Sequence, residues 1–298
     1  MINRKIEYFL TLAECLNFTQ AAARHNVSQT AVSQYIASLE DRLEVKLFNR
    51  TPHAVTMTEA GRYYYEQITK LLRSYDDTLV NIKNIAAGYH GYIKVGIGVY
   101  EYCSTEFLFS RFLAAHPEIK VDILQYPYSE LAEKLRTREL DVIIGPDFCQ
   151  DFFARKELTK RVLFRSSNYL AVHPDIAARY PSGDIREILM GECLITNCED
   201  DGPSSLNMLY NLLKDAVGFV PNRIEQTNSV NAQLMMVRAG HGVAIVPDFV
   251  IDSQPMELIR YELPSDMHPD YQLMKLKKNI NEAADLLMDF PLSEGVQG

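Results

Sequence analysis

The chain has 298 residues, of which 47% are hydrophobic and 23% are charged, a composition typical of a folded protein with more than one domain. The net charge of −9 argues against a polyanion partner for the chain as a whole, and five cysteines without CxxC or Cys/His spacing favour reduced thiols over a zinc site. No apolar run reaches the roughly 18 residues that a bilayer span needs, and acidic residues come too early for a secretory signal, so we expect a cytoplasmic protein without a membrane partner.

The charge is unevenly distributed along the chain. Residues 1–58 hold six Lys or Arg and five Asp or Glu, a net charge of +1, which leaves −10 for the remainder. The N-terminal segment is therefore the only part suited to meet DNA, although it is not strongly basic.

Two short helices are expected first. An apolar row with helical spacing predicts a helix that stops near Asn17. A second helix follows at once, with Thr19 as its expected N-cap, and the small side chains of residues 21–23 let another helix cross closely.

A third helix has one apolar and one polar face. Ser28 is its expected N-cap, and the apolar row consists of Val32, Ile36, Leu39 and Leu43. The opposite face is rich in amides and hydroxyls, whereas a merely solvated face usually carries Lys and Glu. Two helices joined by a turn, the second with such a face, are typical of a helix-turn-helix that reads base edges in the major groove.

The next segment predicts a wing and a long helix. The sequence around Thr51-Pro52-His53 predicts two short strands, with Arg50 at the base of the wing. From Thr58 to Gly88, apolar residues recur alternately every three or four positions, which predicts a helix roughly 44 Å long that packs against a second chain. The sequence GYHGY then predicts a hinge.

Beyond the hinge, strand and helix patterns alternate. They predict an α/β domain of two lobes, the first at about 92–163 and 267–298 and the second at about 164–266. A cleft between two such lobes is a favourable site for a small polar ligand.

The N-terminal motifs carry a family resemblance. The alanine pair, Ser-Gln, Val-Ser before Ile-x-x-Leu-Glu, Leu-Phe-x-Arg and Thr-x-Ala-Gly resemble, in type and spacing, the signature of LysR-type transcriptional regulators. In the C-terminal half, the element order and the segments ELDVIIG and RAGHGVAIVP are also similar to that family. Thr30 stands where the family commonly has proline, and Glu44 where it frequently has glycine, which puts the angle of the wing in question.

The resemblance implies a three-part organisation. It comprises a winged helix-turn-helix at 1–58, a linker and dimerisation helix at 59–88, and at 92–298 an effector-binding domain like a periplasmic binding protein. It further implies binding to a promoter dyad in double-stranded DNA, modulation by a small-molecule effector, assembly as a dimer or tetramer, and RNA polymerase as a further partner. The identity of the effector does not follow from it.

Residues for DNA contact follow from the polar helix face and the wing. We expect Gln29, Thr30, Ser33 and Gln34 at base edges, Thr19, Ser28 and Arg50 at phosphates, and His53 at the wing tip.

Residues for the effector follow from the loops that leave a strand and enter a helix. Backbone N–H groups at helix N-termini are unsatisfied there and favour anionic or strongly polar ligands, although Glu101 leaves room for a cationic group. The expected residues are Tyr100, Glu101, Ser104, Thr105, Tyr128, Ser129, Thr196, Asn197, Asn228 and Ser229, with Thr196 and Ser104 the strongest choices.

The sequence lacks the motifs of the common classes of enzyme. Gly96-x-Gly98-x-x-Glu101 has no third glycine for a dinucleotide fingerprint, and GxSxG, GxxxxGK[ST] and HExxH are absent, so we expect no enzyme, catalytic residue, cofactor or metal. Two alternatives stay open: a regulator that senses oxidants through Cys193 and Cys198, and a ligand-binding protein whose helical head contacts only proteins.

Overall fold

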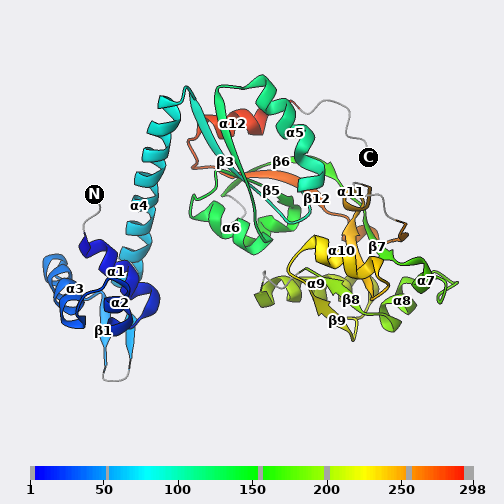
Figure 1. Ribbon diagram of the computed structural model, residues 1–298, viewed down its shortest axis with the longest axis horizontal. Coiled ribbons are helices and arrows are strands. Elements are labelled where there is room, and N and C mark those ends of the chain that lie inside the picture. The colour runs from blue at the N-terminus through cyan, green and yellow to red at the C-terminus, as the bar shows by residue number, and fades with distance from the viewer. Residues whose placement is uncertain (1–3, 52–53, 154–156, 198–201, 253–256, 292–298) are drawn as a thin grey trace. The chain divides into compact units, whose positions relative to one another are not determined.

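A computed structural model describes residues 4–51, 54–153, 157–197, 202–252 and 257–291. The chain divides into two compact units, Met1–Ile82 and Lys83–Gly298 (Figure 1). Among the described residues, no helix combines the length and apolar character needed to cross a membrane.

The first unit begins with three helices, α1 (Arg4–Cys15), α2 (Phe18–Arg24) and α3 (Gln29–Leu43). Their apolar faces meet in one core that includes Phe9, Ala21 and Ile36. The predicted apolar row of α3 is confirmed for its first three members, Val32, Ile36 and Leu39, which are buried. It is wrong for Leu43, which is 39% exposed because it ends the helix, just before the chain turns away at Glu44.

The helix ends follow simple capping chemistry. The prediction for α3 is confirmed, since Ser28 Oγ accepts a hydrogen bond from the Ala31 amide at 3.1 Å. The N-cap of α2 is Asn17 and not Thr19: Asn17 Oδ1 accepts from the amides of Thr19 and Gln20. Glu44 ends α3 with φ of +54°, a left-handed conformation that costs little in glycine and more in other residues.

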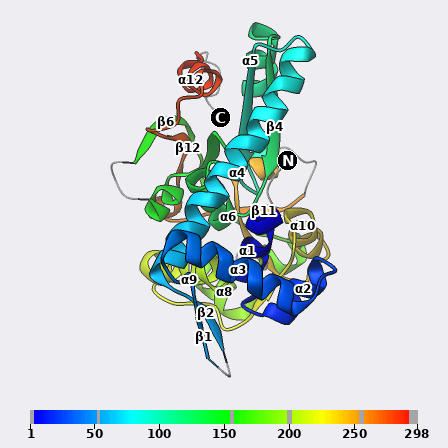
Figure 2. The same ribbon diagram turned by 90° about the vertical axis from the view of Figure 1, so that its left-hand side faces the viewer.

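A hairpin and a long helix complete this unit. Strands β1 (Phe48–Arg50) and β2 (Val55–Met57) pair antiparallel and project from the helices in both views (Figures 1 and 2). Helix α4 (Glu59–Ala86) follows, and Thr58 Oγ1 caps it by accepting from the Gly61 amide. A Cβ at Gly61 would lie 2.0 Å from the Leu47 carbonyl oxygen, so only glycine lets α4 approach the start of the wing this closely.

Apolar side chains are exposed along α4. Leu71 and Ile82 are 64% and 57% exposed, and Tyr75 and Leu79 are exposed as well. These residues lie on the heptad-like row that the sequence predicts, and nothing in the described part of the chain covers them.

The second unit contains two five-stranded sheets. In the first, the order is β4-β3-β5-β12-β6, with β12 antiparallel to both of its neighbours. Its strands are β3 (Gly91–Ile97), β4 (Ile119–Gln125), β5 (Val142–Pro146), β6 (Leu158–Arg165) and β12 (Asp270–Leu276). The helices of this lobe are α5 (Tyr102–Ala115), α6 (Tyr128–Arg136), the 3₁₀ helix η1 (Asp147–Phe152) and α12 (Glu282–Asp289).

In the second sheet, the order is β11-β7-β10-β8-β9. Its strands are β7 (Asn168–Val172), β8 (Leu194–Thr196), β9 (Ile224–Gln226), β10 (Val243–Pro247) and β11 (Ile259–Glu262). The helices of this lobe are α7 (Pro174–Ala177), α8 (Ile185–Gly191), α9 (Gly202–Val217), α10 (Val230–Arg238), α11 (Asp248–Asp252) and the 3₁₀ helix η2 (Ser265–Met267). Figure 1 shows the two lobes, the first from teal to green with its last elements in orange and red, and the second from green through yellow to orange.

The chain crosses between the sheets twice, from β6 to β7 and from β11 to β12. Asn168 Nδ2 donates to the Met267 carbonyl at 2.5 Å and so joins the two crossings. Ser166 Oγ on the first crossing donates to Asp248 Oδ1 of α11 at 2.7 Å. Residues on these crossings lie between the lobes, where a ligand can contact both.

Candidate DNA interface and ligand cavity

The polar face of α3 is open at its N-terminal end. Gln29, Thr30 and Gln34 are exposed, and Ser33 is half-buried. The amides and hydroxyls lie in the first two turns of the helix, the part that enters the major groove in helix-turn-helix proteins. This face can therefore offer hydrogen bonds to base edges.

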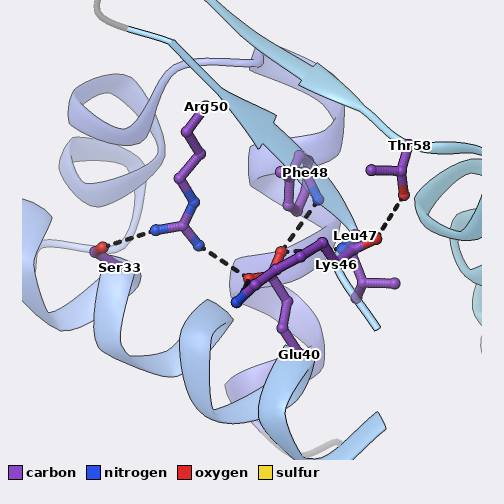
Figure 3. A network of polar contacts seen from close by, with 7 residues as sticks. All are labelled: Ser33, Glu40, Lys46, Leu47, Phe48, Arg50 and Thr58. Carbon is purple, nitrogen blue, oxygen red and sulfur yellow. Dashed lines mark hydrogen bonds and ion pairs between the residues drawn. The ribbon is translucent and has the colours of Figure 1, made fainter. Parts of the chain in front are cut away.

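A buried carboxylate joins α3 to the wing (Figure 3). The side chain of Glu40 is 1% exposed. Its Oε1 accepts hydrogen bonds from the backbone amides of Leu47 at 3.0 Å and Phe48 at 3.1 Å, while its Oε2 pairs with Lys46 at 3.1 Å. Sequence reasoning missed Glu40, although the signal was available: it follows the buried Ile36 by four residues and so falls on the apolar side of α3.

Arg50 is held between α3 and Glu40. Its Nη1 donates to Ser33 Oγ at 3.2 Å, and its Nη2 lies 3.5 Å from Glu40 Oε2 (Figure 3). The guanidinium also lies 4.8 Å from the centroid of the Phe18 ring. The side chain is still 35% exposed. Arg50 thus fixes the orientation of Ser33, and any phosphate contact uses a guanidinium whose position is already set.

The remaining residues predicted for DNA contact are placed differently. Thr19 is exposed at the second position of α2, and its amide already donates to Asn17. Ser28 is exposed and caps α3. His53 lies outside the described residues.

A cavity of about 440 Å³ lies between the two lobes. Much of its wall is aromatic or aliphatic, with contributions from Val99, Tyr100, Tyr128 and Phe148 on the first lobe and Leu194, Ile195, Leu212 and Ile245 on the second. A volume of this size fits a small organic molecule.

Tyr100 links the two lobes across this cavity. Its hydroxyl lies 3.1 Å from Gln233 Oε1 and 3.2 Å from Asn197 Oδ1. Gln233 is itself fixed, because its Nε2 donates to the Ile195 carbonyl at 2.8 Å.

Two buried polar atoms of the lining residues have no hydrogen-bond partner among the described residues. They are Asn197 Nδ2 and His268 Nε2. Buried polar atoms are almost always paired in folded proteins, so these two lining residues are candidates for contact with a ligand.

Glu101 lies beside the cavity wall and does not line the cavity. Its carboxyl is fully buried, Tyr128 Oη donates to Oε1 at 3.1 Å, and the Tyr100 amide donates to Oε2 at 3.1 Å. Burial raises the pKa of this carboxyl to about 8, and it raises the pKa of the Tyr128 hydroxyl as well.

Of the residues predicted for effector contact, four line the cavity: Tyr100, Tyr128, Thr196 and Asn197. Ser104 and Thr105 do not, because both hydroxyls donate to the Glu101 carbonyl within α5. Ser229 does not, because its Oγ caps α10 by accepting from the Ala232 amide. Its exposed neighbour Asn228, and Ser129 on α6, also lie off the wall.

Sequence reasoning missed lining residues that no strand-to-helix loop supplies. Gln233 lies one turn into α10, Asn168 begins β7 after the first crossing, and His268 lies on the second crossing. No sequence spacing relates these residues, since the tertiary fold brings them together.

The alternative of a regulator that senses oxidants depends on a pair of cysteines, Cys193 and Cys198. Cys193 is buried, and burial raises the pKa of its thiol, which disfavours the reactive thiolate. Cys198 lies outside the described residues. Within the described ranges, no group of three or more His, Cys, Asp or Glu side chains is arranged to hold a metal ion.

Curated relatives match most of the chain. It is 28% identical over 279 residues to the transcriptional regulator XapR of Escherichia coli, covering 91% of this chain and 92% of that one. It is 24% identical to the regulator BenM of Acinetobacter baylyi, covering 90% and 86%.

A solved structure of CbnR with its target DNA has the same fold, with a TM-score of 0.64 at 22% identity over 96% of this chain and 97% of that one. Two family models match. The bacterial regulatory helix-turn-helix model of the lysR family covers residues 3–62, and the LysR substrate binding domain model covers residues 93–294. The chain therefore belongs to the LysR family and is a DNA-binding transcriptional regulator with an effector-binding domain.

Proposed function

We propose that this regulator reads double-stranded promoter DNA with the N-terminal turns of α3. The observation that carries the proposal is the exposed face of Gln29, Thr30 and Gln34, next to a wing that the buried Glu40 holds against the same helix. Amide side chains pair well with adenine edges, and hydroxyls with any base, so this face supplies sequence preference. Arg50, Ser28 and Thr19 contact phosphates and fix the position of the head on the duplex, and His53 lies at the tip of the wing.

Self-association is part of the same proposal. The apolar row on α4, with Leu71, Tyr75, Leu79 and Ile82 exposed, pairs with the same row of a second chain. A single small head of low charge buries too little DNA surface for strong specificity, whereas two heads read two half-sites of a dyad. Further pairing of dimers gives a tetramer.

The small molecule acts through the cavity between the lobes. Tyr100 and Tyr128 from one lobe and Thr196 and Asn197 from the other contact it, so its binding shifts the equilibrium between open and closed lobes. RNA polymerase is the downstream partner, the protein catalyses no reaction, and it acts in the cytoplasm.

The test is selection of DNA by the full-length protein. A randomised duplex pool is enriched on the protein, and binding of the selected duplex is compared with binding of a scrambled duplex. Gln29→Ala weakens binding to the selected duplex by about 1–3 kcal/mol and leaves binding to the scrambled duplex nearly unchanged. Gln20→Ala, at an exposed glutamine on α2, serves as the matched control.

Two results would contradict the proposal. Equal loss on both duplexes would remove the base-reading role of Gln29. Failure of the pool to enrich at all would favour a head that contacts proteins in place of DNA.

A further inference from the structure

We infer that the effector of this regulator is a small polar aromatic molecule without negative charge, bound in the cavity between the lobes. The inference deepens the proposed function and rests on it. It depends on the charges, the unpaired atoms and the rings of the cavity wall.

The charged residues of the wall do not suit an anion. Asp147 and Asp215 line the cavity, and among the described lining residues there is no lysine or arginine. An anion that enters this space loses hydration, meets the half-buried Asp147 and the exposed Asp215, and finds His268 as the one side chain among the described lining residues that can carry a positive charge. An uncharged molecule avoids this cost, and a cation gains from both carboxylates.

The beginning of α5 is also closed to an anion. A helix N-terminus in a cleft would ordinarily offer its amides to a negative ligand. Here the carboxyl of Glu101 already accepts from the Tyr100 amide at 3.1 Å, and it is fully buried behind Tyr100 and Tyr128. The Ser104 and Thr105 amides of α5 donate to the Glu101 carbonyl, and the buried Glu101 side chain takes the Tyr100 amide, so these amides already have acceptors within the protein.

The wall nevertheless requires a polar partner. Asn197 Nδ2 and His268 Nε2 are buried and unpaired among the described residues. The amide donates, and the imidazole nitrogen donates or accepts according to its tautomer. A ligand with a carbonyl, an amide or a ring nitrogen satisfies these atoms.

The rest of the wall favours a flat, apolar body. The rings of Tyr100, Tyr128, Phe148 and Tyr271 all line the cavity. Aromatic faces stack on flat molecules and attract cations, so they suit an aromatic amide or amine.

Three probes of nearly equal size test the charge preference: benzamide, benzylamine and benzoate. Their dissociation constants are measured with the full-length protein at pH 7 by calorimetry and by thermal shift. We expect benzamide and benzylamine to bind at least about tenfold more tightly than benzoate. Tighter binding of benzoate, or no binding of any probe at millimolar concentration, would overturn the inference.

Two variants test the residues. Asn197→Leu removes the unpaired amide and weakens benzamide binding at least about tenfold, whereas Asn222→Leu, at an exposed residue off the cavity wall, changes it less than about threefold. The double variant Asp147→Asn/Asp215→Asn shifts the benzoate-to-benzylamine affinity ratio at least about tenfold towards benzoate. Asp175→Asn/Asp289→Asn makes the same change of net charge at exposed positions off the cavity wall and leaves that ratio unchanged.

The DNA experiment separates the two proposals. If the protein enriches a duplex and the probes fail as described, the ligand class is wrong and the regulator function stands. Any benzamide effect of Asn197→Leu is accepted only if the variant keeps the parental circular dichroism and melting temperature, which shows that the effector-binding domain is folded.

Discussion

The phenolic oxygen of Tyr100 lies 3.1 Å from Oε1 of Gln233, although 133 positions of sequence separate the two residues. Tyr100 precedes α5 in one lobe, and Gln233 lies on α10 in the other. This hydrogen bond therefore crosses the ligand cavity and holds its two walls together. A ligand that accepted this hydrogen bond in place of Gln233 would remove one contact between the lobes.

Tyr100→Phe should loosen the lobes. The variant keeps the ring and loses the hydroxyl, which lowers the free energy of unfolding of this unit by about 0.5–1.5 kcal/mol in urea titrations. Hydrogen exchange of β8 and α10 amides should become faster. Tyr102→Phe, at a 40% exposed tyrosine two residues further on, is the control. Equal exchange rates in Tyr100→Phe and the parent would show that the bond does not restrain the lobes.

Glu40→Ala should disrupt the wing. It leaves the amides of Leu47 and Phe48 without an acceptor, and each buried unpaired amide costs about 1–3 kcal/mol. The melting temperature of the head and its affinity for a selected duplex should both fall. Asp41→Asn removes the exposed neighbouring carboxylate and should leave both unchanged. A Glu40→Ala protein with parental stability would remove Glu40 from this role.

Leu79→Glu should prevent pairing of α4. A charge placed on the apolar row must be buried in the paired state, which costs several kcal/mol without a partner charge. Light scattering at micromolar concentration should then report a monomer, or a dimer where the parent forms a tetramer. Asn81→Glu carries the same new charge about 200° further around the helix and should keep the parental mass. A parental mass for Leu79→Glu would place the interface elsewhere.

The buried acid Glu101 should make stability depend on pH. Since its pKa rises from an ordinary 4.5 to about 8, the native chain binds more protons than the unfolded chain between these values. Its contribution to stability is therefore fully present below pH 4.5 and is lost as the pH rises through 8, with a slope approaching about 1.4 kcal/mol per pH unit.

The amide of Glu101→Gln does not titrate and keeps the shape of the protonated acid. The fall in melting temperature between pH 5.5 and 8.5 should therefore be smaller in this variant than in the parent. Glu106→Gln, at an exposed residue of the same helix, should behave like the parent. Identical pH profiles of Glu101→Gln and the parent would show that Glu101 is ionised throughout.

The head was largely predictable from the sequence, because short helices around one core need apolar residues at helical spacing. The N-cap of α2, for which Thr19 was the wrong prediction, has a local cause. Asn17 and Thr19 are both good N-caps, and the choice depends on Leu16, whose φ of +48° ends α1 and leaves Asn17 in the extended conformation of a cap. A left-handed backbone conformation at a leucine cannot be predicted from the sequence, because leucine rarely adopts it.

The cavity was predictable only where it follows local rules. The rule that strand-to-helix loops line a cleft found Tyr100, Tyr128, Thr196 and Asn197, which lie at or just after the ends of β3, β4 and β8. It placed Glu101 on the wall, whereas the fold turns that carboxyl inward towards Tyr128. It could not find Gln233 or His268, because their positions depend on how distant segments pack.

Strand β12 has a consequence for the order in which this protein matures during synthesis. It lies between β5 and β6 yet comes from residues 270–276, so the first sheet is incomplete until almost all of the chain has left the ribosome. Everything in the winged head precedes residue 83. A message cut short between residues 83 and 269 therefore encodes the complete winged head without a finished first sheet of the second unit.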